Sequence, residues 1–115
     1  MDVYRASRPF YYGRWDAAAQ AHATVGISER NQAARNGFFD GAALDPPATR
    51  AALKKLIAPV LLYAGEMDAL VTPAMMREAA PLFRDATVIV QPGASHFPWI
   101  DDPAAFAAAV GPFLH

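Results

Sequence analysis

Two side chains suited to catalysis each follow a segment of this sequence that is predicted to be a strand. Asp68 closes a Gly-Glu-Met-Asp segment after the apolar residues 60–64, and His96 closes a Gly-Ala-Ser-His segment after residues 86–91. In open α/β sheets, ligand-binding and catalytic groups lie at the carboxyl ends of the strands. Neighbouring parallel strands would therefore place this carboxylate and this imidazole side by side.

The two predicted strands are recognised by short apolar runs with clear ends. Residues 60–64 (VLLYA) lie between Pro59 and Gly65, as expected of a strand that is buried on both faces. Residues 86–91 (ATVIVQ) predict the second strand, which a Pro-Gly pair closes. A helix-length connection between them implies parallel strands with a right-handed crossover. Because parallel sheets normally contain more than two strands, we expect this sheet to be incomplete.

Helices are predicted after each strand. Thr72 followed by Pro73 indicates a helix that begins with a threonine cap, and Pro81 should kink or end it early. Residues 101–103 (DDP) predict the start of the last helix in the same way. The apolar stripe of that last helix is expected to contain Phe106, Val110, Phe113 and Leu114.

Residues 1–57 predict helices and loops without a convincing strand. We expect an alanine-rich helix over about 15–24, a second helix from an N-cap at Ser28 to about 36–37, and a third over about 47–57. The aromatic residues within 10–15 suit an acyl or aromatic substrate pocket, internal packing or an association surface. His22, in the first of these helices, is expected to be a solvated or packing residue.

Composition narrows the class of protein. The chain has 115 residues, 54% of them hydrophobic, which predicts one small domain with a packed core. A net charge of -1 without a basic block argues against nucleic acid and membrane surfaces. The absence of cysteine excludes disulfides and thiolate metal sites, and the three histidines lack metal-ligand spacing. With no apolar run near the roughly 20 residues of a membrane span, and no signal peptide, we expect a cytoplasmic protein without metal or cofactor.

The segments 58–73 (APVLLYAGEMDALVTP) and 88–106 (VIVQPGASHFPWIDDPAAF) together resemble the end of an α/β-hydrolase. In that family a strand-Gly-x-x-Asp segment supplies the triad acid, and the histidine lies in a Gly-x-x-His-x-Pro context after the last strand. The resemblance implies that Asp68 is the acid and His96 the proton-transferring base, with Glu66 as the rival acid.

The same resemblance implies a partial α/β-hydrolase fold: two parallel strands with crossover helices, preceded by a helical lid-like region. Residues 1–57 would be that lid-like region, and residues 58–115 the C-terminal strand-helix-strand-helix unit. Within the lid-like region, residues 8–15 (RPFYYGRW) resemble proline-iminopeptidase-like hydrolases of actinobacteria.

One feature of the family does not occur in this sequence, namely the nucleophile elbow G-x-S-x-G. The serines are Ser7, Ser28 and Ser95, and only Ser95 begins like an elbow, with Phe97 where the second glycine should stand. The resemblance therefore implies the C-terminal segment of a hydrolase for ester or amide substrates, inactive by itself. Two alternatives remain: a non-catalytic remnant that dimerises or binds a partner, and part of an aspartate-nucleophile dehalogenase or epoxide hydrolase.

The missing early strands also predict a partner. Residues 60–64 carry no lysine, charge or internal proline that would protect an unpaired strand edge. We therefore expect either a symmetric homodimer or association with a complementing N-terminal hydrolase segment.

Overall fold

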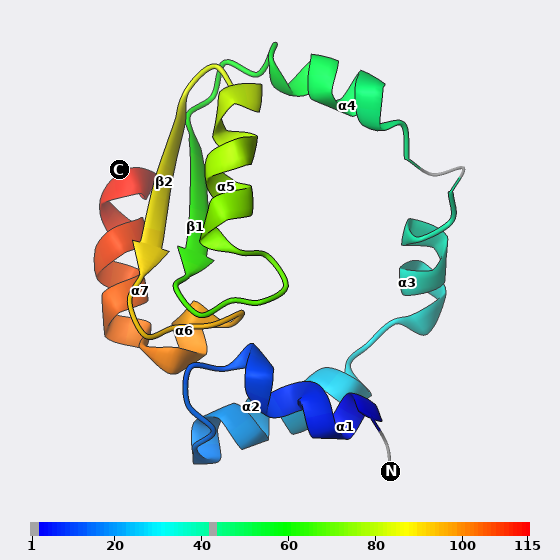
Figure 1. Ribbon diagram of the computed structural model, residues 1–115, viewed down its shortest axis with the longest axis vertical. Helices are drawn as coiled ribbons and strands as arrows, with labels where there is room; N and C mark the ends of the chain where they lie inside the picture. The colour runs from blue at the N-terminus through cyan, green and yellow to red at the C-terminus, as the bar shows by residue number, and fades with distance from the viewer. Residues whose placement is uncertain (1–2, 42–43) are drawn as a thin grey trace.

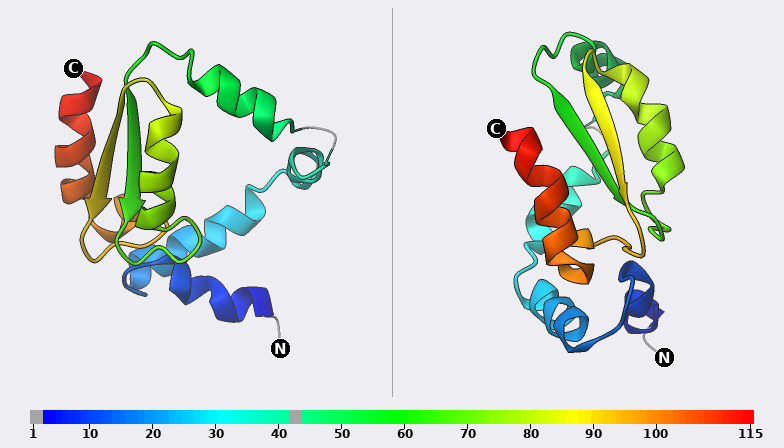
Figure 2. Two further views of the ribbon diagram at one scale, coloured as in Figure 1. Left: turned by 45° about the horizontal axis from the view of Figure 1, so that its top comes forward. Right: turned by 90° about the vertical axis from the view of Figure 1, so that its left-hand side faces the viewer.

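The chain folds around a short parallel sheet with helices on both of its faces. The computed structural model describes residues 3–41 and 44–115. Strands β1 (Val60–Gly65) and β2 (Ala86–Gln91) pair in parallel, in a register that runs from Val60↔Ala86 to Gly65↔Gln91. Helix α5 (Pro73–Ala79) covers one face and α7 (Pro103–Val110) the other (Figures 1 and 2). The predicted parallel pair is confirmed.

The helices of this unit begin where the sequence predicts. Thr72 caps α5, since its side chain accepts from the amide of Met75, and the helix passes at Ala79 into a 3-10 turn that contains Pro81 (η2, Ala80–Leu82). Asp102 caps α7 in the same way. The one-turn helix α6 (Pro98–Asp101) was not predicted, because four residues are too short to show a helical period.

The last turn of the chain differs from the expected apolar stripe. After α7 the backbone tightens into a 3-10 helix (η3, Gly111–Leu114). A 3-10 helix has three residues per turn rather than 3.6, so Leu114 rotates off the helical face, whereas Phe113 stays half-buried. Leu114 is 70% exposed, and its predicted place in the stripe is wrong.

In the described residues of the first half, every element of secondary structure is a helix. These are α1 (Val3–Ser7), the 3-10 helix η1 (Arg8–Tyr11), α2 (Ala17–Ser28), α3 (Gln32–Phe38) and α4 (Pro46–Leu53). Figure 1 shows α1 and α2 across the carboxyl ends of the strands, while α3 and α4 arc away from the sheet. Within the described residues, no helix has the length and apolar character needed to cross a membrane.

The boundaries of these helices correct the sequence prediction. Ser28 is not an N-cap: it is the last residue of α2, and its hydroxyl donates to the carbonyl of Val25. Asn31 caps α3 instead, and Asp45 caps α4, which ends at Leu53 rather than near residue 57. At both positions the side-chain oxygen accepts from the amide three residues on, whereas the Ser28 hydroxyl is bonded within α2.

A small aromatic core joins the two halves. Tyr12, Ala19 and Ala23 are buried together, and Phe97 and Ile100 pack against them from the segment after β2. The rings of Tyr12 and Phe97 lie 5.0 Å apart. The aromatic residues within 10–15 therefore differ in burial: Tyr12 is 7% exposed, whereas Phe10 is 76% exposed. The helical half is thus anchored at the carboxyl edge of the sheet.

A substitution at Gly65 should test how tightly this edge is packed. A Cβ at Gly65 would lie 2.1 Å from the carbonyl oxygen of Ser95 and 2.6 Å from that of Ala94, so the loop after β2 would have to move. We expect Gly65→Ala to lower the free energy of unfolding by about 1–3 kcal/mol, measured by urea denaturation. The control is Gly26→Ala in α2, where an added Cβ would meet nothing within 4 Å beyond its own helix backbone and chain neighbours, and a gain of up to about 1 kcal/mol is expected. Equal stability of the two variants would contradict this packing.

Candidate active site

Asp68 and His96 meet at the carboxyl edge of the sheet. The Oδ2 atom of Asp68 lies 2.9 Å from Nδ1 of His96, so the two side chains lie side by side as the two strand ends predict. The Asp68 side chain is 7% exposed and that of His96 is 32% exposed. Because a carboxylate only accepts hydrogen bonds, Nδ1 carries the proton in this pair, and Nε2 is the basic nitrogen of the ring.

The Asp68 carboxylate is held from its other side as well. Its Oδ1 atom accepts from the backbone amides of Leu70 at 2.8 Å and Val71 at 3.1 Å. The loop itself is tied to the loop of His96, since the amide of Met67 donates to the carbonyl of Ala94 at 2.8 Å. The carboxylate therefore has one oxygen fixed by the backbone and the other aimed at the imidazole.

His96 is positioned by the first half of the chain. Its backbone amide donates to the carbonyl of Tyr11 at 2.9 Å, and the Tyr11 ring lies 6.0 Å from the imidazole. Gly93, with a φ of 68°, makes the turn that precedes the histidine. A positive φ is a conformation that glycine adopts without strain. The orientation of the histidine thus depends on both halves of the fold.

A polar network beneath the site fixes the segment after His96. The Tyr63 hydroxyl donates to Oε1 of the buried Gln91 at 2.6 Å, and Nε2 of Gln91 donates to the carbonyl of Pro98 at 3.0 Å. Burial raises the pKa of Tyr63, and the charge of Asp102 raises it further, so the hydroxyl stays protonated and able to donate. No sequence pattern indicates this network, because Tyr63, Gln91 and Pro98 lie on three different elements.

Ser95 and Glu66 have structural roles. Ser95 is 1% exposed, its hydroxyl donates to the carbonyl of Phe10, and its amide donates to Asp101. Glu66 is exposed and accepts from the amide of Gly93 at 2.9 Å, so it caps the turn rather than contacting the imidazole of His96. Asp68 is therefore the carboxylate that meets the histidine.

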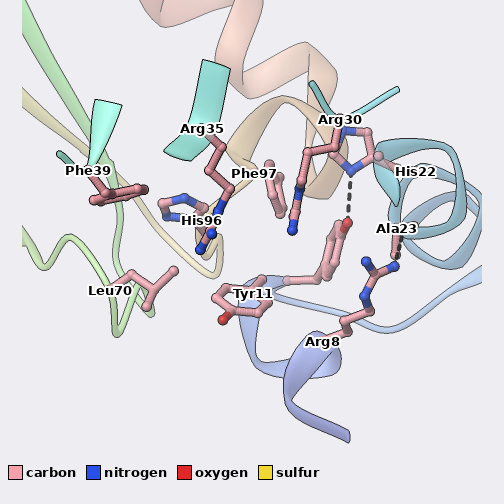
Figure 3. A pocket seen from close by; sticks show the side chains of 12 residues that line it. Arg8, Tyr11, His22, Ala23, Arg30, Arg35, Phe39, Leu70, His96 and Phe97 are labelled. Carbon is pink, nitrogen blue, oxygen red and sulfur yellow. Dashed lines mark hydrogen bonds between the residues drawn. The ribbon is translucent and has the colours of Figure 1, made fainter. Parts of the chain in front are cut away.

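His96 opens onto a cavity of about 610 Å³ between the two halves of the chain (Figure 3). Tyr11, Phe97 and Phe39 supply aromatic walls, and His22 lies among them. The Nδ1 atom of His22 is hydrogen-bonded to the Tyr12 hydroxyl at 2.8 Å, and the imidazole packs edge-on against the Phe97 ring. His22 therefore has the packing role expected of it, and its side chain also lines the cavity.

Three arginines line the same cavity, Arg8, Arg30 and Arg35, and sequence analysis missed them. Nothing in their spacing marked them, because they lie on different elements that only the fold brings together. In the described part of the chain, no group of three or more His, Asp or Glu side chains is arranged to hold a metal ion.

Residues 2–109 match the sequence profile of the Alpha/beta hydrolase family. The chain belongs to this family. Among solved structures, a thermophilic esterase from Thermogutta terrifontis with malate bound is similar, at 30% identity and a TM-score of 0.56. The match covers 64% of this chain and 27% of the esterase, so the chain spans little more than a quarter of that protein's length. No curated protein matches the sequence.

Membership of the α/β-hydrolase family agrees with the partial α/β-hydrolase fold expected from the sequence: two parallel strands with crossover helices. The match extends over the helical first half, which therefore belongs to the family region as well. The closer resemblance of residues 8–15 to proline-iminopeptidase-like hydrolases stays a prediction.

A serine-directed probe should leave this α/β-hydrolase chain unlabelled. Ser95 is buried and bonded to backbone carbonyls, and Ser28 is bonded within α2. We expect a fluorophosphonate to give no stoichiometric adduct by mass spectrometry of the 115-residue chain. An adduct that His96→Ala abolishes would reveal an unforeseen nucleophile and contradict this expectation.

Proposed function

We propose that this chain supplies the acid and the histidine of a catalytic triad for hydrolysis of ester or amide substrates. In this proposal the nucleophile lies on an N-terminal α/β-hydrolase segment outside this sequence. The observation that carries the proposal is the 2.9 Å contact from Oδ2 of the buried Asp68 to Nδ1 of His96. A contact through Nδ1 leaves Nε2, the nitrogen that can reach a nucleophile, as the base.

The chemistry follows from that contact. Nε2 of His96 takes the proton of the nucleophile hydroxyl as its oxygen attacks the substrate carbonyl carbon. The imidazolium then gives this proton to the leaving alcohol or amine as the ester or amide bond breaks, and the acyl group stays on the nucleophile oxygen. Water then attacks the acyl carbon and gives a proton to Nε2. The imidazolium returns this proton to the nucleophile oxygen, which releases the acid and restores the hydroxyl. Asp68 stabilises the positive charge on the ring at each step.

Acyl chemistry is favoured over the dehalogenase or epoxide-hydrolase alternative by the similarity to an esterase. The number of hydrogen bonds that hold the Asp68 carboxylate also favours a catalytic acid over the alternative of a non-catalytic remnant. Two backbone amides and an imidazole hold this carboxylate, and such precision is what a triad acid requires.

A chimera with the Thermogutta terrifontis esterase tests the proposal. The region of the esterase that matches this chain is removed and replaced by the 115-residue chain, and hydrolysis of 4-nitrophenyl acetate is measured. The chimera should hydrolyse the ester, whereas the truncated esterase alone and the chimera with His96→Ala should not. A chimera that is folded by circular dichroism and inactive would contradict the proposal.

A further inference from the structure

Three of the described residues that line the cavity next to His96 are arginines, although the chain as a whole carries no excess of positive charge. Arg8, Arg30 and Arg35 line it, and no Asp or Glu is among the described residues that line it. The chain carries 10 basic and 11 acidic residues, so its composition predicts no such excess. Three of the ten basic residues therefore gather at the cavity that His96 lines.

The arginines come from the helical half. Arg35 lies on α3, and its guanidinium carbon is 5.3 Å from the centre of the Phe39 ring. A guanidinium that packs on a ring is held in orientation while the N–H groups at its rim point outward. Figure 3 shows Arg35 and Arg30 reaching toward the space beside His96 and Tyr11.

Arg8 also lines the cavity, from the 3-10 helix η1. Its Nη1 atom donates to the carbonyl of Ala23 in α2, which fixes the guanidinium against the helix. Arg8 is half-buried, whereas Arg30 and Arg35 are exposed and line the cavity from its solvent side.

We propose that this cavity selects ester substrates that carry a carboxylate, which Arg35 and Arg30 bind while the ester carbonyl faces His96. This inference rests on the proposed hydrolase function and names its substrate class. The arginine fork matches the two oxygens of a carboxylate. A volume of about 610 Å³ suits a small monoester of a dicarboxylic acid, and Phe39, Tyr11 and Phe97 suit an aromatic alcohol part.

Binding to the 115-residue chain tests the inference without any catalysis. Monobenzyl succinate, an anion, is compared with its neutral counterpart benzyl methyl succinate by NMR titration. The anion should bind at least about tenfold more tightly, because a charge-assisted hydrogen bond is worth that much. Arg35→Gln and Arg30→Gln should each remove most of this preference, while Arg35→Lys should keep part of it.

The matched control is Arg50→Gln, since Arg50 is an exposed arginine of α4 that does not line the cavity. It should leave both affinities unchanged. Equal binding of the two esters, or equal behaviour of folded Arg35→Gln and Arg50→Gln, would overturn the inference.

The two proposals fail in distinguishable ways. An esterase chimera that hydrolyses anionic and neutral esters with equal kcat/KM would leave the hydrolase function standing and remove the substrate class. A preference for the anion in binding, together with an inactive chimera, would leave an anion-binding cavity and remove the hydrolase.

Discussion

Replacing His96 by alanine should lower kcat by about 10⁴-fold or more in a hydrolase assembled from this chain and a nucleophile-bearing segment. In the proposed triad the imidazole is the base, held by Asp68 through Nδ1 at 2.9 Å, and the loss of the ring would remove both proton transfers. KM for a small ester should change little, because the ring contributes mainly in the transition state. Steady-state hydrolysis of 4-nitrophenyl esters measures both constants.

Asp68→Asn should produce a comparable loss, about 10⁴-fold in kcat, with the fold intact. The amide cannot replace both the charge and the two accepting oxygens, which now bind His96 on one side and the amides of Leu70 and Val71 on the other. The imidazole would then lose its required tautomer and the stabilisation of its charged form.

Two controls separate the triad from general damage. Glu66→Gln changes the neighbouring carboxylate, which caps the amide of Gly93, and His115→Ala removes an exposed histidine. Both should keep kcat within a few fold. If Glu66→Gln were as damaging as Asp68→Asn, the assignment of the acid would be wrong.

By itself the 115-residue chain should associate through the free edge of β1. The amides of Val60 and Glu66 both donate to the β2 side, at 2.9 Å. Because amides alternate along a strand, those of Leu61, Tyr63 and Gly65 point to the opposite edge. In the described residues, β1 pairs with no strand other than β2. An uncharged edge of this kind is a template for a second chain.

We therefore expect light scattering after size-exclusion chromatography to give twice the 12.4 kDa of one chain at micromolar concentration. Leu61→Pro removes one amide from this edge without removing a donor to β2, and should shift the equilibrium toward the monomer. Val88→Pro is the matched control, because by the same alternation its amide faces the outer edge of β2. Circular dichroism verifies that both variants fold.

A monodisperse 12.4 kDa species for the unsubstituted chain would mean that the edge is not an association surface. Equal dimerisation of the Leu61→Pro and Val88→Pro variants would place the contact elsewhere, for example at the exposed Phe10.

Local sequence signals determined the sheet and the pairing of Asp68 with His96. Residues 60–64 and 86–91 are short apolar runs with proline or glycine at their ends, and such runs form strands wherever both faces are covered. Once two strands are parallel, their carboxyl ends share one edge, so the topology places Asp68 and His96 next to each other. The helix starts at Thr72 and Asp102 were equally local, since capping involves residues three positions apart.

Only the tertiary structure decided what surrounds that pair. The carbonyl of Tyr11 holds the amide of His96, and Arg35 reaches the same cavity from a helix far away along the chain. Neither contact has a sequence period, because each depends on how the helical half docks on the edge of the sheet. Ser95 shows the same limit: its type and context suggested a possible nucleophile, whereas its burial and its hydrogen bond to the carbonyl of Phe10 make it a structural residue. Local sequence patterns predict which segments pair as strands, whereas the packing of segments that are distant in sequence determines the walls of a cavity.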